Sequence, residues 1–219
     1  MQNIPRIFLN QTLNQQEMVP VDKNIVHYLR HVMRRNDCLV FNNGTEYNAI
    51  LSEDNNFLII GQKTKHTDPS NKVIFYFAPI KRLDEMLNMV TQLGVAVLQP
   101  VITDRTVARH INWNRMQKII IEASEQSGRN SIPQLLSPIQ FKDLDFKDVV
   151  VADERAGHGK NVADRVIGCE KIFVGPEGGF SSQEFEIMDK NGVRGLSLGK
   201  TILRAEVAAV VAVTKVVNK

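Results

Sequence analysis

The stretch "FVGPEGGFSSQEF", from Phe173 to Phe185, decides how the second half of this 219-residue chain is read. It places three glycines and one proline in five positions, between an apolar run and the polar start of a helix. Glycine at such a turn loses extra backbone entropy on folding, which indicates a positive φ or a close approach of the main chain to another group. On residue chemistry alone, a structural turn and a ligand-binding loop explain the stretch equally well.

A second stretch, "LGKTILRAE" at residues 198–206, repeats the arrangement of strand, glycine and helix start. Open α/β sheets bind ligands at the carboxyl ends of strands, so two such turns at neighbouring strand ends would form one pocket. The first turn, residues 175–179, has neither the GxGxxG spacing nor the GK[ST] sequence of phosphate-binding loops. Arg204 and Glu206 belong either to that pocket or to an ordinary charge pair at a helix start, where the positive helix end favours Glu206.

The chain after Lys72 alternates between apolar runs of strand length and segments with helical periodicity. The expected strands are residues 73–78, 95–100, 148–153, 171–175 and 194–199. The expected helices are residues 80–93, which Gly94 closes, 113–127 after a cap at Asn112, a segment from about Ser181, and 202–217. Repeated strand–helix units predict a parallel sheet with helices on both faces. The last helix is apolar nearly all round, which predicts that it is buried.

Residues 1–61 follow a different pattern, in which short apolar runs are separated by Asn, Asp and Gly. Such runs predict small strands joined by tight turns. One amphipathic helix is expected at residues 24–35. Its apolar face should consist of Ile25, Val26, Leu29, Val32 and Met33. A polar stretch at residues 62–72 is the expected linker, so we predict two domains, at residues 1–70 and 73–219.

The helix at residues 24–35 also carries a basic stripe opposite its apolar face. The stripe consists of His27, Arg30, His31 and Arg34, with Arg35 nearby. Several cations on one face, together with Arg6 in the preceding segment, suit contacts with RNA phosphates. A solvated helix face is the alternative interpretation of the same pattern. No ladder of aromatic residues accompanies the stripe, so stacking on bases is not indicated.

Charge and cysteine usage limit the remaining classes of function. The 27 Lys and Arg against 24 Asp and Glu permit an anionic partner without requiring one. Cys38 and Cys169 lie far apart and form no metal-ligand pattern, so we expect a reducing compartment, no disulfide and no metal. No apolar run reaches the roughly 18 residues of a membrane span, and we expect a soluble, cytoplasmic protein. Ser124 and Ser127 lack the Gly-x-Ser-x-Gly context of a nucleophile elbow, so hydrolase chemistry at these serines has no support.

Taken together and in this order, several motifs resemble the family of 16S ribosomal RNA uridine-N3 methyltransferases, known as the ribosomal small subunit methyltransferase E family. The motifs are "RIF", "HYLRHVMR", Lys81 ahead of "QLGV", "DRT", "EASEQSGR", "VGPEGGFSSQE" and "LGKTILRAEVA". The resemblance covers nearly the whole chain, and the last two motifs at this separation are highly specific. It implies a PUA-like β-barrel that binds RNA, followed by an α/β domain of the SPOUT class with a C-terminal trefoil knot. It also implies a homodimer, S-adenosylmethionine (S-adenosyl-L-methionine) as methyl donor, and 16S ribosomal RNA or the 30S subunit as substrate.

The resemblance also assigns roles to residues of this chain. The cofactor-binding residues would be Gly175, Pro176, Glu177, Gly178, Gly179, Leu198, Gly199, Ile202 and Leu203. The RNA-binding residues would be Arg6, His27, Arg30, Arg34, Lys81 and Arg129. Arg204 and Glu206 become the catalytic candidates. Arg204 would stabilise the developing uridine anion, and Glu206 would position Arg204 or accept the proton.

This chain departs from the family pattern at a few positions. Met89 and Gln92 replace a Lys and a Glu, and Val207 replaces a Thr close to the expected cofactor. None of these changes removes the two glycine turns. Two other functions remain open: a non-catalytic dimeric RNA-binding protein with a degenerate SPOUT domain, and a small-molecule enzyme that uses the pocket for a nucleotide.

Overall fold

The computed structural model describes residues 4–42, 44–69, 72–107, 111–158, 162–166 and 168–217. The chain divides into two compact units. Unit 1 contains Met1–Pro69 and Ile121–Ile132, and unit 2 contains Ser70–Ile120 and Pro133–Lys219. The prediction assigned all of residues 73–219 to the second domain. Residues 121–132 cluster with unit 1 instead, because hydrogen bonds tie Glu125 and Asn130 to its strands.

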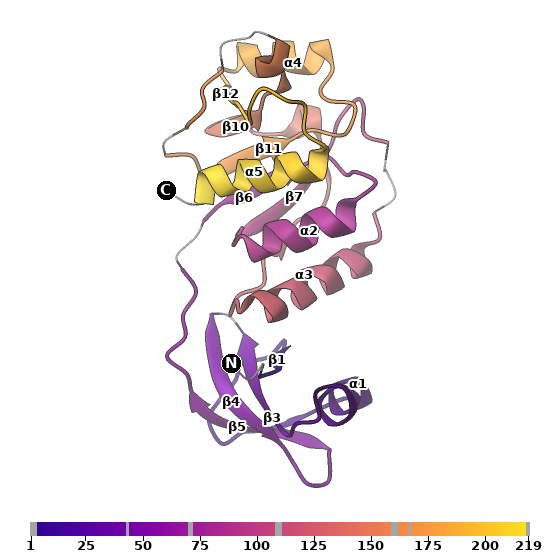
Figure 1. Ribbon diagram of the computed structural model, residues 1–219, viewed down its shortest axis with the longest axis vertical. Coiled ribbons are helices and arrows are strands. Elements are labelled where there is room, and N and C mark those ends of the chain that lie inside the picture. The colour runs from indigo at the N-terminus through magenta and orange to yellow at the C-terminus, as the bar shows by residue number, and fades with distance from the viewer. Residues whose placement is uncertain are drawn as a thin grey trace. The chain divides into compact units, whose positions relative to one another are not determined.

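Unit 1 is built on a curled five-stranded sheet with the order β1-β3-β4-β5-β2 (Figure 1). The strands are β1 (Arg6–Phe8), β2 (Met18–Pro20), β3 (Asp37–Asn42), β4 (Thr45–Leu51) and β5 (Phe57–Lys63). β1 runs parallel to β3, and the other neighbours are antiparallel. Buried side chains of the strands, such as Val40 and Leu58, form an apolar core together with Leu29, which lies outside the strands. The short apolar runs of the sequence thus do form strands.

The helix predicted in unit 1 starts where expected but changes its winding. α1 (Lys23–His27) follows Asp22, whose carboxylate accepts hydrogen bonds from two N–H groups of the first turn. The continuing η1 (Tyr28–Met33) is a π-helix, and it ends at Arg34, which has a φ of 54°. The wider turn rotates Val32 away from the apolar face. Val32 is 58% exposed, so the apolar face predicted for this helix does not include it as a buried residue.

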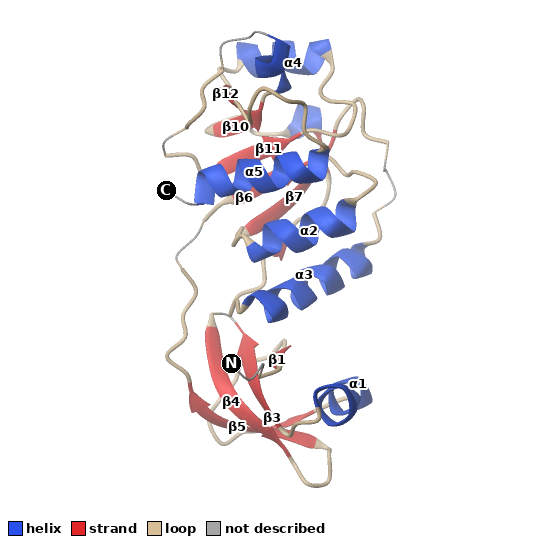
Figure 2. Ribbon diagram, viewed as in Figure 1, coloured by secondary structure: helices blue, strands red, loops and turns tan. Residues whose placement is uncertain are grey.

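Unit 2 is an α/β unit built on a parallel sheet of seven strands (Figure 2). The strands are β6 (Ile74–Phe77), β7 (Val97–Ile102), β8 (Gln134–Leu135), β9 (Ile139–Gln140), β10 (Val149–Ala152), β11 (Lys171–Val174) and β12 (Arg194–Leu196). Their order is β12-β10-β11-β6-β7-β8, and β9 pairs with the carboxyl end of β7. Every pair runs parallel, as the strand–helix alternation predicts.

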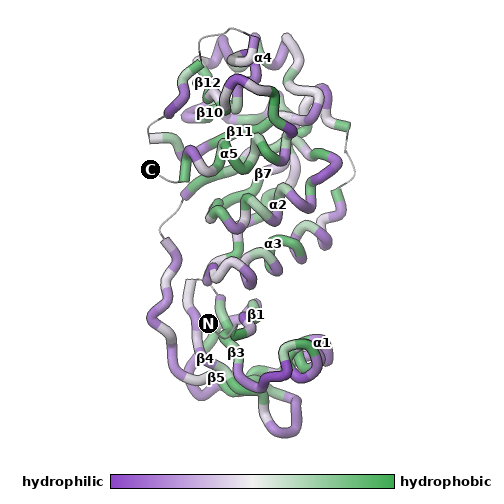
Figure 3. Tube along the Cα trace, in the orientation of Figure 1, coloured by the Kyte–Doolittle hydropathy of each residue, from purple (hydrophilic) through white to green (hydrophobic). Residues whose placement is uncertain are grey.

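Helices cover both faces of this sheet. α2 (Leu83–Gln92) and α5 (Ala205–Val217) pack against each other, and α5 also packs on β11. On the other face, Met188 of α4 (Ser182–Lys190) joins a cluster with Phe173 and Phe180. Figure 3 shows that α5 and the central strands are largely hydrophobic. The predicted burial of the last helix holds for one side of it, which includes Ala209, Ala212 and Val213, whereas Val207, Val210 and Val211 are partly exposed.

Local signals place the C-terminal end of α2 and both ends of α3 where the sequence predicts them, whereas α2 begins at Leu83 and not at Ile80. α2 ends before Gly94, which has a φ of +95°. α3 (Trp113–Ser127) follows Asn112, whose Oδ1 accepts a hydrogen bond from an N–H of the first turn, and stops before Gly128 with a φ of +78°. Two short 3-10 helices, η2 (Phe141–Asp143) and η3 (Glu154–His158), complete unit 2.

The start of α5 corrects one prediction. The helix begins at Ala205 rather than at Ile202, because its first i to i−4 hydrogen bond runs from the Ala208 N–H to the Arg204 carbonyl. Residues 201–204 are therefore part of a loop, although their composition is compatible with a helix.

Candidate active site

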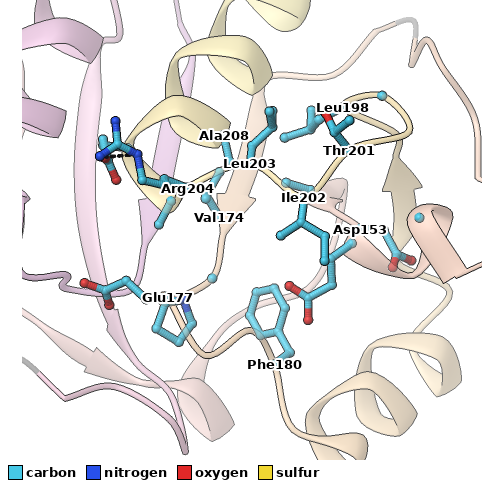
Figure 4. Close-up of a pocket in the computed structure, with 18 of the residues that line it drawn as sticks. Asp153, Val174, Glu177, Phe180, Leu198, Thr201, Ile202, Leu203, Arg204 and Ala208 are labelled. Carbon is cyan, nitrogen blue, oxygen red and sulfur yellow. Dashed lines mark ion pairs between the residues drawn. The ribbon is translucent and has the colours of Figure 1, made fainter.

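A cavity of about 440 Å³ lies at the carboxyl ends of three neighbouring strands, β10, β11 and β12. Its remaining walls come from residues 175–180, called loop 1, from residues 198–204, called loop 2, and from the first turn of α5 (Figure 4). Open parallel sheets bind ligands at this edge. The volume falls within the range of cavities that hold small molecules.

Loop 1 is held in place by hydrogen bonds to three other segments. The bonds run from the Lys81 N–H to Glu177 Oε1 (2.8 Å), from Arg105 Nη1 to the Gly178 carbonyl (2.8 Å) and from the Phe180 N–H to the Glu154 carboxylate. Inside the loop, the Gly179 N–H donates to the Pro176 carbonyl at 2.9 Å and closes a tight turn. Loop 1 therefore has a defined shape without a ligand.

Two of the three glycines in loop 1 are required by the packing of the protein itself. Gly179 has a φ of +69°, and a Cβ there would clash with the Glu154 carboxylate. A Cβ on Gly175 would lie 2.9 to 3.2 Å from the ring of Phe180. Gly178 has neither constraint, since a Cβ there would make only ordinary contact at 3.5 Å. Contact between these glycines and a ligand stays a prediction.

Loop 2 forms another wall of the cavity with few bonds of its own. Gly199 has a φ of +122°, which favours glycine at this position. The Ile202 side chain lines the cavity and is 81% exposed. No hydrogen bond joins residues 200–203 to another residue that the structure describes.

Arg204 and Glu206 meet at the cavity. Arg204 Nε lies 3.2 Å from Glu206 Oε1, and Figure 4 marks this ion pair with a dashed line. The Arg204 side chain is 67% exposed, whereas that of Glu206 is 6% exposed. Arg82 Nη1 lies 3.8 Å from the same oxygen, which accepts no hydrogen bond of regular geometry within the described structure. One buried carboxylate thus holds the guanidinium of Arg204 beside the cavity.

Sequence analysis missed a third segment that also lines the cavity. It consists of Ala152, Asp153, Glu154 and Gly157, at and after the end of β10. The signal was the polar pair that follows the apolar run "VVVA". The sequence does not show that this pair lies beside the two glycine turns, because β10 lies between β11 and β12 only in the folded sheet.

Arg155 ties this third segment to α4. Its guanidinium donates to Asp153 Oδ2 at 2.7 Å and to Asp189 Oδ2 at 2.8 Å. It also lies over the ring of Phe185, 3.8 Å from the ring centre. The hydrogen bond to Asp153 is the main reason that the pKa of Arg155 is raised. The segment is therefore fixed relative to the sheet and α4.

Seven of the nine predicted cofactor-binding residues line the cavity. They are Gly175, Pro176, Glu177, Leu198, Gly199, Ile202 and Leu203. Gly178 and Gly179 belong to loop 1 but are not among the lining residues. The lining also includes the apolar side chains of Val174, Phe180 and Ala208.

Arg6, a predicted RNA-binding residue, makes contacts inside unit 1. Its side chain is 10% exposed, and its Nη2 lies 2.9 Å from Glu46 Oε2. The same nitrogen donates to Asn130 Oδ1 at 2.6 Å, and the guanidinium lies 4.6 Å from the ring centre of Phe41. The charge and the hydrogen-bond donors of Arg6 are therefore satisfied within unit 1, and its contact with RNA stays a prediction.

The basic stripe is mostly exposed on α1 and η1. His27 and His31 are exposed with their ring centres 5.1 Å apart, and Arg34 at the end of η1 is also exposed. Arg30 is partly buried and donates from its Nε to Asn55 Oδ1 at 2.8 Å. Three members of the stripe therefore face solvent in unit 1.

The remaining predicted RNA-binding residues lie in different units. Lys81 of unit 2 lines the cavity and is exposed. Arg129 of unit 1 is partly buried, and this burial lowers its pKa although Asp68 opposes the effect. The six residues therefore do not form one site within either unit.

Other kinds of site were also considered. Within the described ranges, no group of three His, Cys, Asp or Glu side chains is arranged to hold a metal ion. None of the helices in that part of the chain is long and apolar enough to cross a membrane. Cys38 and Cys169 are buried and are not joined in a disulfide, and burial raises the pKa of Cys38 to about 12.

Comparison with known proteins identifies the family. The model of the RNA methyltransferase domain family matches residues 67–217. Ribosomal RNA small subunit methyltransferase E of Rickettsia conorii is 31% identical, with 96% of this chain and 94% of the relative covered. The protein of the same name from Mesomycoplasma hyopneumoniae is 27% identical, with 97% and 99% covered.

A solved structure supports the same relationship. The crystal structure of ribosomal RNA small subunit methyltransferase E from Neisseria gonorrhoeae, bound to S-adenosyl methionine, matches with a TM-score of 0.83 at 28% identity. The match covers 97% of this chain and 96% of that one. The family predicted from the sequence motifs is confirmed: the chain belongs to the ribosomal RNA small subunit methyltransferase E family of RNA methyltransferases.

Proposed function

We propose that this protein methylates N3 of a uracil in 16S ribosomal RNA, with the small ribosomal subunit as its target. The enzyme class, a ribosomal RNA methyltransferase that uses S-adenosylmethionine, was predicted from the sequence and is confirmed by the family and by its cofactor-bound relative. The choice of uracil and of its N3 atom goes further, and it rests on the family resemblance together with the chemistry of the cavity.

The observation that carries the proposal is that loop 1, loop 2 and the Arg204–Glu206 pair meet at one cavity. Its residues fit the cofactor. The apolar side chains of Val174, Leu198 and Leu203 suit an adenine ring, and the main-chain groups of the two loops suit the polar parts of the molecule. Glu206 is one of the residues that line the cavity, and its buried Oε1 lacks a hydrogen bond within the described residues.

The protein's own part in the reaction falls to Arg204 and Glu206. When bound, the cofactor supplies an activated methyl group. Uracil N3 carries a proton and is a poor nucleophile until that proton leaves, so negative charge develops on the uracil carbonyl oxygens. The exposed Arg204 guanidinium would stabilise this charge, and the buried Glu206 would hold Arg204 in position or accept the N3 proton as it leaves. By aligning both reactants, the loops can supply roughly 7–11 kcal/mol of the barrier.

The proposal extends to the finer features of the fold and assembly. Unit 1 would be a PUA-like RNA-binding domain, for which its curled sheet and exposed basic stripe are the support. Unit 2 would be a SPOUT-type domain with a trefoil knot. α5 presents the partly exposed valines Val207, Val210 and Val211, which suit the interface of a cytoplasmic homodimer. Sedimentation equilibrium tests the dimer directly, and a monomer at micromolar concentration would contradict it.

The test of the proposed function is methyl transfer to 30S subunits or 16S RNA from a strain that lacks this protein. The wild type should add one methyl group to a single uracil, and mass mapping of the digested RNA should place it on N3. Arg204→Ala should reduce turnover about a hundred- to a thousandfold while the chain still binds S-adenosylmethionine. Arg194→Ala removes an exposed arginine outside the cavity and serves as the control. Near-normal turnover of Arg204→Ala would reject the catalytic role, and salt-sensitive RNA binding without any transfer would favour a non-catalytic RNA-binding protein.

A further inference from the structure

The cavity wall carries charges of both signs, and they are unevenly neutralised. At one part of the wall, Glu206 shares its Oε1 between Arg204 and Arg82. At another, Asp153 is bonded by Arg155, whose Nε donates to Oδ1 at 2.9 Å and whose Nη2 donates to Oδ2 at 2.7 Å. These carboxylates therefore already have cationic partners.

Glu154, the next residue along the chain, differs from both. Its carboxylate accepts a hydrogen bond from the Phe180 N–H, and it lies close against the main chain of Gly179. Within the described part of the chain no cationic side chain forms an ion pair with it, and Arg105 and His158 act on it only at longer range. Burial, followed by the charge of Asp153, raises the pKa of Glu154. The arrival of a positive charge in the cavity would thus stabilise this carboxylate.

Resting on the proposed function, we propose that Glu154 makes the cavity select a positively charged ligand. Glu154 is then the specificity residue that favours S-adenosylmethionine over S-adenosylhomocysteine, the product in which the sulfur is neutral. The residue lines the same cavity as loops 1 and 2. Among the described residues of the wall, two other carboxylates have cationic partners, and Glu177 accepts a hydrogen bond from the Lys81 N–H. Within the same described residues, Glu154 has neither a cationic partner nor a bond from Lys81.

The physical basis is the charge that methyl transfer removes. The sulfonium of the cofactor becomes a thioether, while the adenosine and amino-acid parts keep their structure. A carboxylate in a partly apolar cavity attracts the sulfonium more strongly than it would in water, because the effective dielectric constant is lower. It has no such attraction for the neutral sulfur. Glu154 would therefore also favour the replacement of product by fresh cofactor.

The test is calorimetric titration of the full chain with each of the two ligands. Glu154→Gln removes the charge but keeps an oxygen that can accept the Phe180 N–H. We expect its affinity for S-adenosylmethionine to fall about five- to tenfold, and its affinity for S-adenosylhomocysteine to change less than about twofold. Glu186→Gln removes the same charge from an exposed position of α4 outside the cavity, and it should alter neither affinity.

The outcomes separate this inference from the proposed function. The inference would be overturned if Glu154→Gln lowered the affinities for both ligands equally. It would also be overturned if the ratio of the two affinities stayed as in the wild type. Glu154→Asp keeps the charge and should keep most of the preference, so its loss in that variant would contradict an electrostatic role even if Glu154→Gln failed to fold. A wild-type chain that binds neither ligand would overturn the proposed function itself.

Discussion

Loop 1 and loop 2 face the same cavity, yet they are held in different ways. Loop 1 is fixed by Glu177, by Arg105 and by Glu154, each of which bonds it to a different segment. In loop 2, residues 200–203 make no hydrogen bond to another described residue, and Ile202 is largely exposed. The difference teaches that one wall of the cavity is fixed by the protein's own hydrogen bonds, whereas the other has few of them and could gain contacts only from a ligand.

This division of roles has an energetic reason. A preformed wall pays its ordering cost during folding, so less affinity is lost when the ligand binds. A wall with few internal bonds keeps conformational freedom, which allows a ligand to enter and product to leave. Substitutions in or near loop 1 should therefore affect stability, and those in loop 2 should affect binding.

The largest effect on stability is expected at Arg155, which fixes the segment that carries Glu154. Arg155→Ala removes its bonds to the buried Asp153 and to Asp189, and it should lower the free energy of unfolding by about 2–4 kcal/mol. Arg155→Lys keeps the charge without the bidentate geometry and should lose roughly half as much. Denaturant unfolding measures both. A loss below about 0.5 kcal/mol for Arg155→Ala would show that this segment is not anchored by the arginine.

A matched pair of glycine substitutions tests loop 1 itself. Gly179→Ala introduces a Cβ at a φ of +69° and against Glu154, so it should cost about 2 kcal/mol of unfolding free energy. Gly178→Ala has neither penalty and should stay within about 0.5 kcal/mol of the wild type. Thermal unfolding of the two variants checks the difference. Similar stabilities would mean that loop 1 adapts more readily than its bonds suggest.

A smaller effect is expected at Arg105, whose Nη1 donates to the Gly178 carbonyl. Because Arg105 is exposed, Arg105→Ala should cost only about 0.5–1 kcal/mol. It should, however, speed hydrogen exchange of the loop 1 amides relative to those of α4. If hydrogen exchange in loop 1 were unchanged, the bond from Arg105 would not contribute to holding the loop in place.

The smallest effect on stability is expected at Ile202 of loop 2. Its side chain is exposed, so Ile202→Ser should change the free energy of unfolding by less than about 0.5 kcal/mol. Affinity for S-adenosylmethionine should nevertheless fall severalfold, because the apolar side chain lines the cavity and would be covered by the ligand. An intact affinity in calorimetry would place the ligand away from loop 2.

Much of unit 2 could be predicted because its signals are local. Gly94, Asn112 and Ser181 mark helix ends through their own backbone and side-chain chemistry, and the alternation of apolar runs with amphipathic segments predicts a parallel sheet. Both loops of the site were found in the same way, from glycines that follow apolar runs. The start of α5 was placed three residues early because residues 202–204 have a helix-compatible composition.

What could not be predicted depends on contacts between distant residues. Arg6 appears as a free cation in the sequence, and only the fold shows its pairing with Glu46, forty positions away. Glu154 entered the site only through the order of the strands. The π-helical winding that exposes Val32 has no composition of its own, so helical periodicity assigned that residue to the apolar face.

The central claim is that the two loops hold S-adenosylmethionine between them. Hydrogen–deuterium exchange of the full chain, with and without saturating cofactor, tests it most directly. We predict that the amides of loop 1 exchange slowly in both states, and that those of loop 2 become slow only when the cofactor is present. Exchange in loop 2 that is the same with and without bound cofactor would contradict the account.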